Sequence, residues 1–168
     1  MIYRLPELND KIMLHEYVQE HYDNGETSIS ASLDLSISDY SEWVEKIQNN
    51  AYVGDNEWGK SLLYLCFDEM KLVGLLSVRY ELSKTLSEKY GDIGYGVRPS
   101  ERRKGYATAM LRYALATCKE KGLKRVILGC YKDNFASAAT IKRNGGVLFA
   151  ENDNYTDERT SQYYLINL

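Results

Sequence analysis

The chain has 168 residues, of which 44% are hydrophobic and 27% are charged, and its formal net charge at pH 7 is −3. A chain of this length can bury roughly two-thirds of its unfolded surface in one core, so we expect a single domain over residues 1–168. The negative charge argues against nucleic acid as the main partner. No segment reaches the run of about 18 apolar residues that a membrane span needs, so no membrane partner is expected.

The cysteines and the first residues indicate a cytoplasmic protein. Met1–Pro6 lacks the basic and then apolar layout of a secretion signal. Cys66, Cys118 and Cys130 form an odd set in apolar surroundings, which predicts reduced core thiols rather than disulfides. The spacing of the two histidines fits no metal site, so no metal is expected.

The first half of the chain combines short apolar strands with two amphipathic helices. In the second helix Tyr40, Trp43, Val44 and Ile47 recur at helical spacing and form one apolar face. Two apolar runs around a three-residue turn predict a hairpin. The predicted elements are, in order, a strand at Ile2–Leu5, helices at Asp10–His21 and Ser38–Gln48, and strands at Ser61–Phe67, Lys71–Tyr80 and Asp92–Val97.

A basic turn follows the strand that ends at Val97. Pro99 cannot donate to a sheet ladder and stops the strand, and the segment Arg102–Thr108 then carries three cations around Gly105. The next residues place apolar side chains on one face of a helix. Free N–H groups and the positive end of the helix dipole favour an anion in such a turn. The turn is neither a P-loop nor a dinucleotide fingerprint, and we expect a ligand that carries phosphate.

The last third predicts one buried strand, a second helix and two closing strands. Gly122 is expected to end the helix that follows the basic turn. Either Asp133 or Asn134 can cap the next helix, which ends at Asn144-Gly145. The expected strands are Val126–Leu128, Val147–Ala150 and Ser161–Ile166.

Two motifs in this half resemble the GNAT superfamily of N-acetyltransferases. Arg102-x-x-Gly105-x-Ala107 matches the family pattern Arg/Gln-x-x-Gly-x-Gly/Ala, and Asn134-x-x-Ser137 belongs to a second motif that ends in Asn-Gly-Gly. The resemblance is strong from about residue 90 to 149 and only architectural before that. It implies an α/β (α+β) fold with about four helices. Its mixed, mostly antiparallel sheet of about seven strands would be splayed between the fourth and fifth strands.

The resemblance implies transfer of an acetyl group from acetyl-coenzyme A (acetyl-CoA) to a small-molecule or peptide amine, by direct attack in a ternary complex. The tyrosine and the glutamate that serve as acid and base in many members are replaced by Ile141 and Gly129. A non-catalytic acyl-CoA-binding sensor or docking module of the same fold is therefore the alternative. A longer acyl group or a hydroxyl acceptor also stays open, as does a homodimer through the last strands. No residue identifies the acceptor.

The resemblance also implies which residues hold the coenzyme. Backbone amides of the fourth strand would meet the thioester, the basic turn would hold the diphosphate, and an asparagine would hold the pantetheine arm. The implied set is Tyr95, Gly96, Val97, Arg102, Arg103, Lys104, Gly105, Tyr106, Ala107, Thr108, Asn134 and Ser137. Gly94 and Gly96 either let a ligand approach the strand closely or only accommodate packing.

The catalytic candidates are Ser137, Asp92 and Glu81. Ser137 lies one helical turn before Ile141, so its hydroxyl can reach the coenzyme sulfur, although a local bond to the helix backbone is an equal alternative. Only about 1 in 2,500 molecules of an alkylamine is neutral at pH 7, so the acceptor needs a base or a desolvating pocket. Asp92 and Glu81, on neighbouring predicted strands, are candidates for a base that acts through water.

Overall fold

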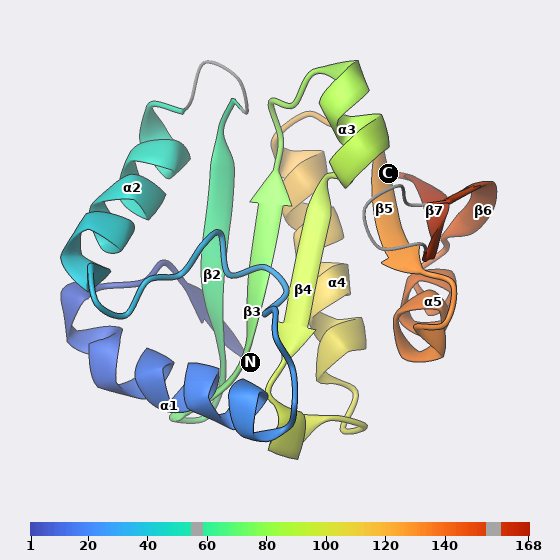
Figure 1. Ribbon diagram of the computed structural model, residues 1–168. Coiled ribbons are helices and arrows are strands. Elements are labelled where there is room, and N and C mark those ends of the chain that lie inside the picture. Colours follow the sequence, from blue (N-terminus) through green and yellow to red (C-terminus); the bar gives the residue numbers. More distant parts are fainter. Residues whose placement is uncertain (55–58, 154–158) are drawn as a thin grey trace.

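The structure, a computed structural model, describes residues 1–54, 59–153 and 159–168. The strands form two antiparallel sheets, with helices on both faces of the first sheet (Figure 1). The first sheet has the order β1-β2-β3-β4 and the second has the order β5-β7-β6. The strands are β1 (Ile2–Arg4), β2 (Ser61–Asp68), β3 (Lys71–Arg79), β4 (Ile93–Val97), β5 (Arg125–Tyr131), β6 (Val147–Asp153) and β7 (Thr160–Asn167). The expected seven strands are thus present.

Helices cover both faces of the first sheet. The α-helices are α1 (Lys11–Asp23), α2 (Tyr40–Tyr52), α3 (Lys84–Tyr90), α4 (Tyr106–Glu120) and α5 (Phe135–Arg143), with 3-10 turns at Leu8–Asp10 and Pro99–Glu101. In Figure 1, α1 and α2 lie on one side of β2 and β3, and α4 lies behind them. This explains why seven consecutive residues of β3, from Leu72 to Val78, are buried. No helix in the described part of the chain has the length and apolar character to cross a membrane.

The described residues contain five α-helices, one more than the expected number of about four. The missed one is α3, which is only seven residues long and therefore too short to show a helical apolar period. Its ends carry local signals instead. The Ser83 side chain accepts a hydrogen bond from the Leu86 N–H at 3.3 Å, and Gly91 follows with φ +74°.

The two sheets meet at one end of β4 and separate beyond it. The Asp92 N–H donates to the Ile127 carbonyl at 2.8 Å, and the Asp92 carboxylate accepts from the Ile127 N–H at 2.6 Å. Among the described residues, one backbone–backbone hydrogen bond joins the two edges, and it lies at this place. The expected splay between the fourth and fifth strands is confirmed.

Candidate functional site

The basic turn between β4 and α4 is exposed and presents backbone N–H groups at the start of the helix. Arg103 and Gly105 adopt left-handed backbone conformations, with φ values of +65° and +88°. No side chain caps α4, and the first bond into the helix runs from the Ala109 N–H to the Gly105 carbonyl at 3.1 Å. The earlier amides of this helix therefore lack an intrahelical partner. A Cβ atom on Gly105 would meet no atom within 4 Å, so the space beside this residue is open to a ligand.

Two of the three cations in this turn are already paired. Arg102 makes a bidentate bond to Glu26, with distances of 2.7 and 2.9 Å, and also donates to the Val97 carbonyl at 3.1 Å. Lys104 donates to Glu101 at 2.8 Å. Arg103 is exposed and has no ion pair within the described residues. Arg103 is therefore the cation available to an anionic ligand, whereas Arg102 and Lys104 fix the shape of the turn.

Carboxylates from the end of α1 hold the turn in place. Glu26 pairs with Arg102, and Glu20 accepts from the Arg98 guanidinium and from the Ser100 N–H, the latter at 2.7 Å. The hydrogen bond from Arg102 lowers the pKa of Glu26 to about 2. Burial raises the pKa of Glu20, but the bonds from Arg98 and Ser100 outweigh it and lower this pKa to about 2.

These two depressed pKa values predict a loss of stability in acid. A carboxyl group whose pKa is lower in the folded chain stabilises the fold above its unfolded pKa, here 4.5, and loses that contribution as the pH falls toward 2. We expect each pair to contribute about 1 kcal/mol to the free energy of unfolding. Urea unfolding at pH 5 and pH 3 measures this. The Glu20→Gln/Glu26→Gln double variant should lose less stability between the two pH values than the wild type, and an equal loss would contradict the prediction.

The edge of β4 that faces β5 carries backbone donors that have no backbone partner among the described residues. The Arg98 N–H bonds to Val73 of β3, and the Arg79 N–H bonds to the Asp92 carbonyl. In an antiparallel pair, the N–H groups of successive residues point alternately toward and away from the partner strand. In this register the N–H groups of Gly94 and Gly96 point toward β3, and those of Tyr95 and Val97 point toward β5. Two of the three expected thioester contacts, Tyr95 and Val97, thus have amides that face the separation, whereas the Gly96 amide belongs to the ladder.

The two glycines of β4 face the segment between α1 and α2. A Cβ atom on Gly96 would lie 2.9 Å from the Ser30 carbonyl, and one on Gly94 would lie 2.9 Å from the Ser77 hydroxyl and 3.8 Å from Ala31. Residues without a side chain therefore let this segment lie directly on the strand. Of the two interpretations given for these glycines, the contacts support close packing.

The start of α5 brings the predicted asparagine and serine together. The Asn134 side chain accepts from the Ser137 N–H at 3.0 Å, so the helix cap is confirmed. Within the part of the chain that the structure describes, the Ser137 hydroxyl makes no hydrogen bond to its own helix and lies 2.9 Å from the Tyr95 hydroxyl on β4. Ile141 is fully buried in the core, so this position offers no proton donor.

The side chain of Tyr95 was not predicted as part of the site, because the family resemblance concerns only its backbone. The sequence nevertheless indicates where this side chain points. Side chains alternate along a strand, so a tyrosine between two glycines that face one side must project to the other side. That side carries α4 and α5 and is the side on which Ser137 lies.

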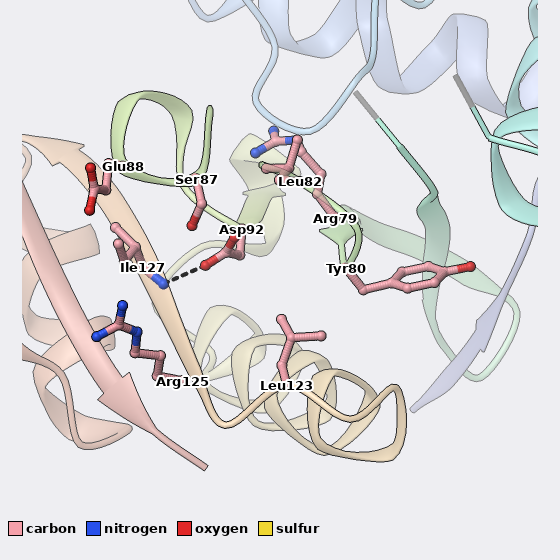
Figure 2. Close-up of a pocket in the computed structure, with 9 residues that line it drawn as sticks. All are labelled: Arg79, Tyr80, Leu82, Ser87, Glu88, Asp92, Leu123, Arg125 and Ile127. Carbon is pink, nitrogen blue, oxygen red and sulfur yellow. Dashed lines mark hydrogen bonds between the residues drawn. The ribbon is translucent and has the colours of Figure 1, made fainter. Parts of the chain in front are cut away.

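The two carboxylates predicted as bases lie in different surroundings. Asp92 is buried at the junction of the sheets, beside a cavity of about 250 Å³ that Ser87, Glu88 and Arg125 also line (Figure 2). Burial raises the pKa of Asp92, although the Ile127 N–H and the Ser87 hydroxyl oppose this. Glu81 is exposed and lies 3.3 Å from Lys60. Within the described residues no hydrogen bond joins either carboxylate to Ser137, and their role as bases stays a prediction.

A sequence model of the acetyltransferase (GNAT) family matches residues 30–145. None of the curated proteins matches the chain in sequence. Similarity to solved structures extends over nearly the whole chain. One is an acetyl transferase from Salmonella typhimurium that modifies the N-terminal serine of 50S ribosomal subunit protein L7/L12. It is 20% identical and has a TM-score of 0.75, over 99% of this chain and 94% of that chain.

Two further structures carry a coenzyme. The microcin C7 self-immunity acetyltransferase, in complex with acetyl-CoA and AMP, is 20% identical with a TM-score of 0.74, over 99% of this chain and 91% of that chain. A putative acetyltransferase from Salmonella typhimurium, YncA, with its cofactor acetyl-CoA, is 14% identical with a TM-score of 0.68, over 99% of this chain and 93% of that chain. At these identities the likeness shows a shared fold.

Proposed function

The chain belongs to the acetyltransferase (GNAT) family, whose model covers more than half of it, and on this basis we propose that it transfers an acetyl group from acetyl-CoA to a small-molecule or peptide amine, by direct attack in a ternary complex. Residues 1–168 act as one domain in this proposal. A homodimer through the last strands stays a prediction.

The observation that carries the proposal is the open turn at the start of α4, next to the separated edges of β4 and β5. The turn offers unpartnered amides, the positive end of a helix of 15 residues and the Arg103 side chain to a diphosphate. The separation beside it suits the pantetheine arm. The Asn134 carbonyl oxygen is used by the helix cap, which leaves its two N–H donors for that arm.

Each chemical requirement of the transfer has a candidate group in the chain. The Tyr95 and Val97 amides face the separation and can stabilise negative charge on the thioester oxygen. Ser137 can donate a hydrogen bond to the departing sulfur. An alkylamine acceptor must lose a proton, which costs about 4.6 kcal/mol at pH 7, and either a base or desolvation under the segment between α1 and α2 must supply this. Asp92 and Glu81 remain the proposed bases.

Two measurements on the purified chain test the proposal. Isothermal titration calorimetry should detect binding of acetyl-CoA, and a thiol-release assay should detect turnover with at least one member of a panel of small amines and peptides with free N-termini. If acetyl-CoA binds but no amine in a broad panel releases thiol, the sensor or docking module is the better description. A lack of binding would contradict both.

A further inference from the structure

A hydrogen bond crosses the space between β4 and α5. The Tyr95 hydroxyl lies 2.9 Å from the Ser137 Oγ and 3.4 Å from the Ser137 carbonyl oxygen. The tyrosine belongs to the first sheet, and the serine belongs to the helix that follows the first strand of the second sheet. The contact therefore links the two halves of the molecule where their backbones have already separated.

Two directions are open to this bond, because each of the two hydroxyls can donate or accept. A phenol has one hydrogen, and the acceptors found for it among the described residues both belong to Ser137. Burial raises the pKa of Tyr95 to about 12, so the phenol keeps its hydrogen at physiological pH. Tyr95 therefore carries a hydrogen that it can donate to the Ser137 Oγ. In that direction the hydrogen of Ser137 is left for a third group.

A thiol lies on the strand that precedes this helix. Burial raises the pKa of Cys130 on β5, whereas the Ser137 hydroxyl and Lys142 lower it. The backbone N–H of Ser137 donates to the side-chain oxygen of Asn134 at 3.0 Å. The Asn134 cap and the contact with Tyr95 therefore hold Ser137 in place at the start of α5.

We propose that Tyr95 is a positioning residue for acetyl transfer: its phenol holds the Ser137 hydroxyl so that the hydroxyl hydrogen points at the departing coenzyme sulfur. This inference rests on the proposed function. The amine nitrogen forms a bond to the carbonyl carbon, and the carbon–sulfur bond breaks. The sulfur keeps the bonding electron pair and accepts the hydrogen bond from Ser137. The proton lost by the new amide nitrogen then passes through water to the sulfur.

The bond from Tyr95 also strengthens the donor. A hydroxyl that accepts a hydrogen bond becomes a better donor to the next group in the chain, because successive hydrogen bonds polarise one another. Removal of the phenol oxygen should weaken the interaction between Ser137 and a thiolate even though Ser137 itself stays in place. A tyrosine that only fills space would have no such effect.

Titration of the thiol of bound coenzyme A tests this without an acceptor amine. The ultraviolet absorbance of the thiolate is followed against pH, with desulfo-coenzyme A as the reference that subtracts the protein's own groups. We expect Ser137→Ala to raise the pKa of the bound thiol by about one unit. Tyr95→Phe should raise it by about half as much or more, and the double variant should match Ser137→Ala, because both residues act through one hydrogen bond.

The matched control is Tyr40→Phe. Tyr40 lies on α2 and is buried, and its hydroxyl donates one hydrogen bond to the Glu7 carbonyl at 2.7 Å. This variant should titrate as the wild type does. At pH 6, where the thiol is protonated throughout, Tyr40→Phe should also bind coenzyme A with a dissociation constant within about twofold of the wild type. With a substrate amine in hand, Tyr95→Phe should lower kcat about tenfold at an unchanged KM.

Two results would overturn the inference while leaving the proposed function intact. One is a Tyr95→Phe variant whose bound thiol titrates at the wild-type pKa. The other is a double variant in which the two shifts add. If the wild type itself does not bind coenzyme A, the proposed function fails instead.

Discussion

Gly105→Glu is expected to lower the affinity for acetyl-CoA by at least a hundredfold, while the chain stays folded. Gly105 precedes α4 in a left-handed conformation, and a side chain there would meet nothing within 4 Å. The new carboxylate would occupy the space proposed for the diphosphate and repel it, and a hundredfold loss corresponds to about 2.7 kcal/mol. Isothermal titration calorimetry measures the effect.

Gly122→Glu is the matched control for this variant. Gly122 follows the other end of α4, about 22 Å away along the helix. It has a φ of +90°, and a side chain there would also meet nothing within 4 Å. Each variant places a glutamate in a left-handed position at a cost of about 1 kcal/mol. At the start of the helix, attraction between the carboxylate and the dipole offsets part of this cost.

Comparison of the two variants therefore distinguishes the effect of backbone strain from the effect of a carboxylate in the proposed coenzyme site. Gly122→Glu should bind acetyl-CoA within about twofold of the wild type and should be no more stable than Gly105→Glu. Thermal unfolding in the absence of ligand measures the stability of both. Tight binding by Gly105→Glu would show that the diphosphate lies elsewhere, and the proposed coenzyme site would be wrong.

The part of this site that the sequence predicts well is the part built from consecutive residues. The strand that ends before Pro99, the basic turn and the helix from Tyr106 follow from local signals: a residue that cannot donate, a glycine and a helical apolar period. The Asn134 cap is equally local, since its partner Ser137 lies three residues on. For this reason the elements around the turn fall close to their predicted bounds.

The part that the sequence does not predict depends on contacts between distant residues. Arg102 belongs to the expected phosphate-binding set, yet it is paired with Glu26, which lies 76 residues earlier in the chain. Nothing near Arg102 in the sequence indicates that partner. The bond from Tyr95 to Ser137 spans 42 residues and depends on how the two sheets separate. Periodicity locates strands and helices, but it does not locate pairs across a gap.

Asp92→Ala is expected to lower the free energy of unfolding by about 2–3 kcal/mol, because it removes the acceptor of a buried N–H group. The Ile127 N–H donates to the Asp92 carboxylate at 2.6 Å, at the point where the two sheets join (Figure 2). Alanine would leave this donor unsatisfied in the interior. Asp92→Asn keeps an oxygen in the same place, so we expect it to stay within about 1 kcal/mol of the wild type at pH 7. Urea unfolding measures both.

The difference in stability between Asp92→Asn and the wild type should change with pH in a defined direction. Burial raises the pKa of Asp92 above its ordinary value of 3.8, so the folded chain holds that proton more tightly than the unfolded chain does. Ionisation therefore costs stability as the pH rises past 3.8, and the full cost is present above the folded pKa. Asparagine cannot ionise and escapes this cost. The stability of Asp92→Asn relative to the wild type should accordingly increase between pH 4 and pH 7, and a decrease would contradict the shift.

Activity of the same variant decides between the two roles of Asp92. If Asp92 only joins the sheets, where the Ile127 N–H and the Ser87 hydroxyl contact its carboxylate, kcat of Asp92→Asn should stay within about fivefold of the wild type. A general base contributes about a hundredfold or more. If Asp92→Asn keeps its stability but loses a hundredfold in kcat, the carboxylate is the base that deprotonates the amine, and the junction is then also the acceptor end of the site.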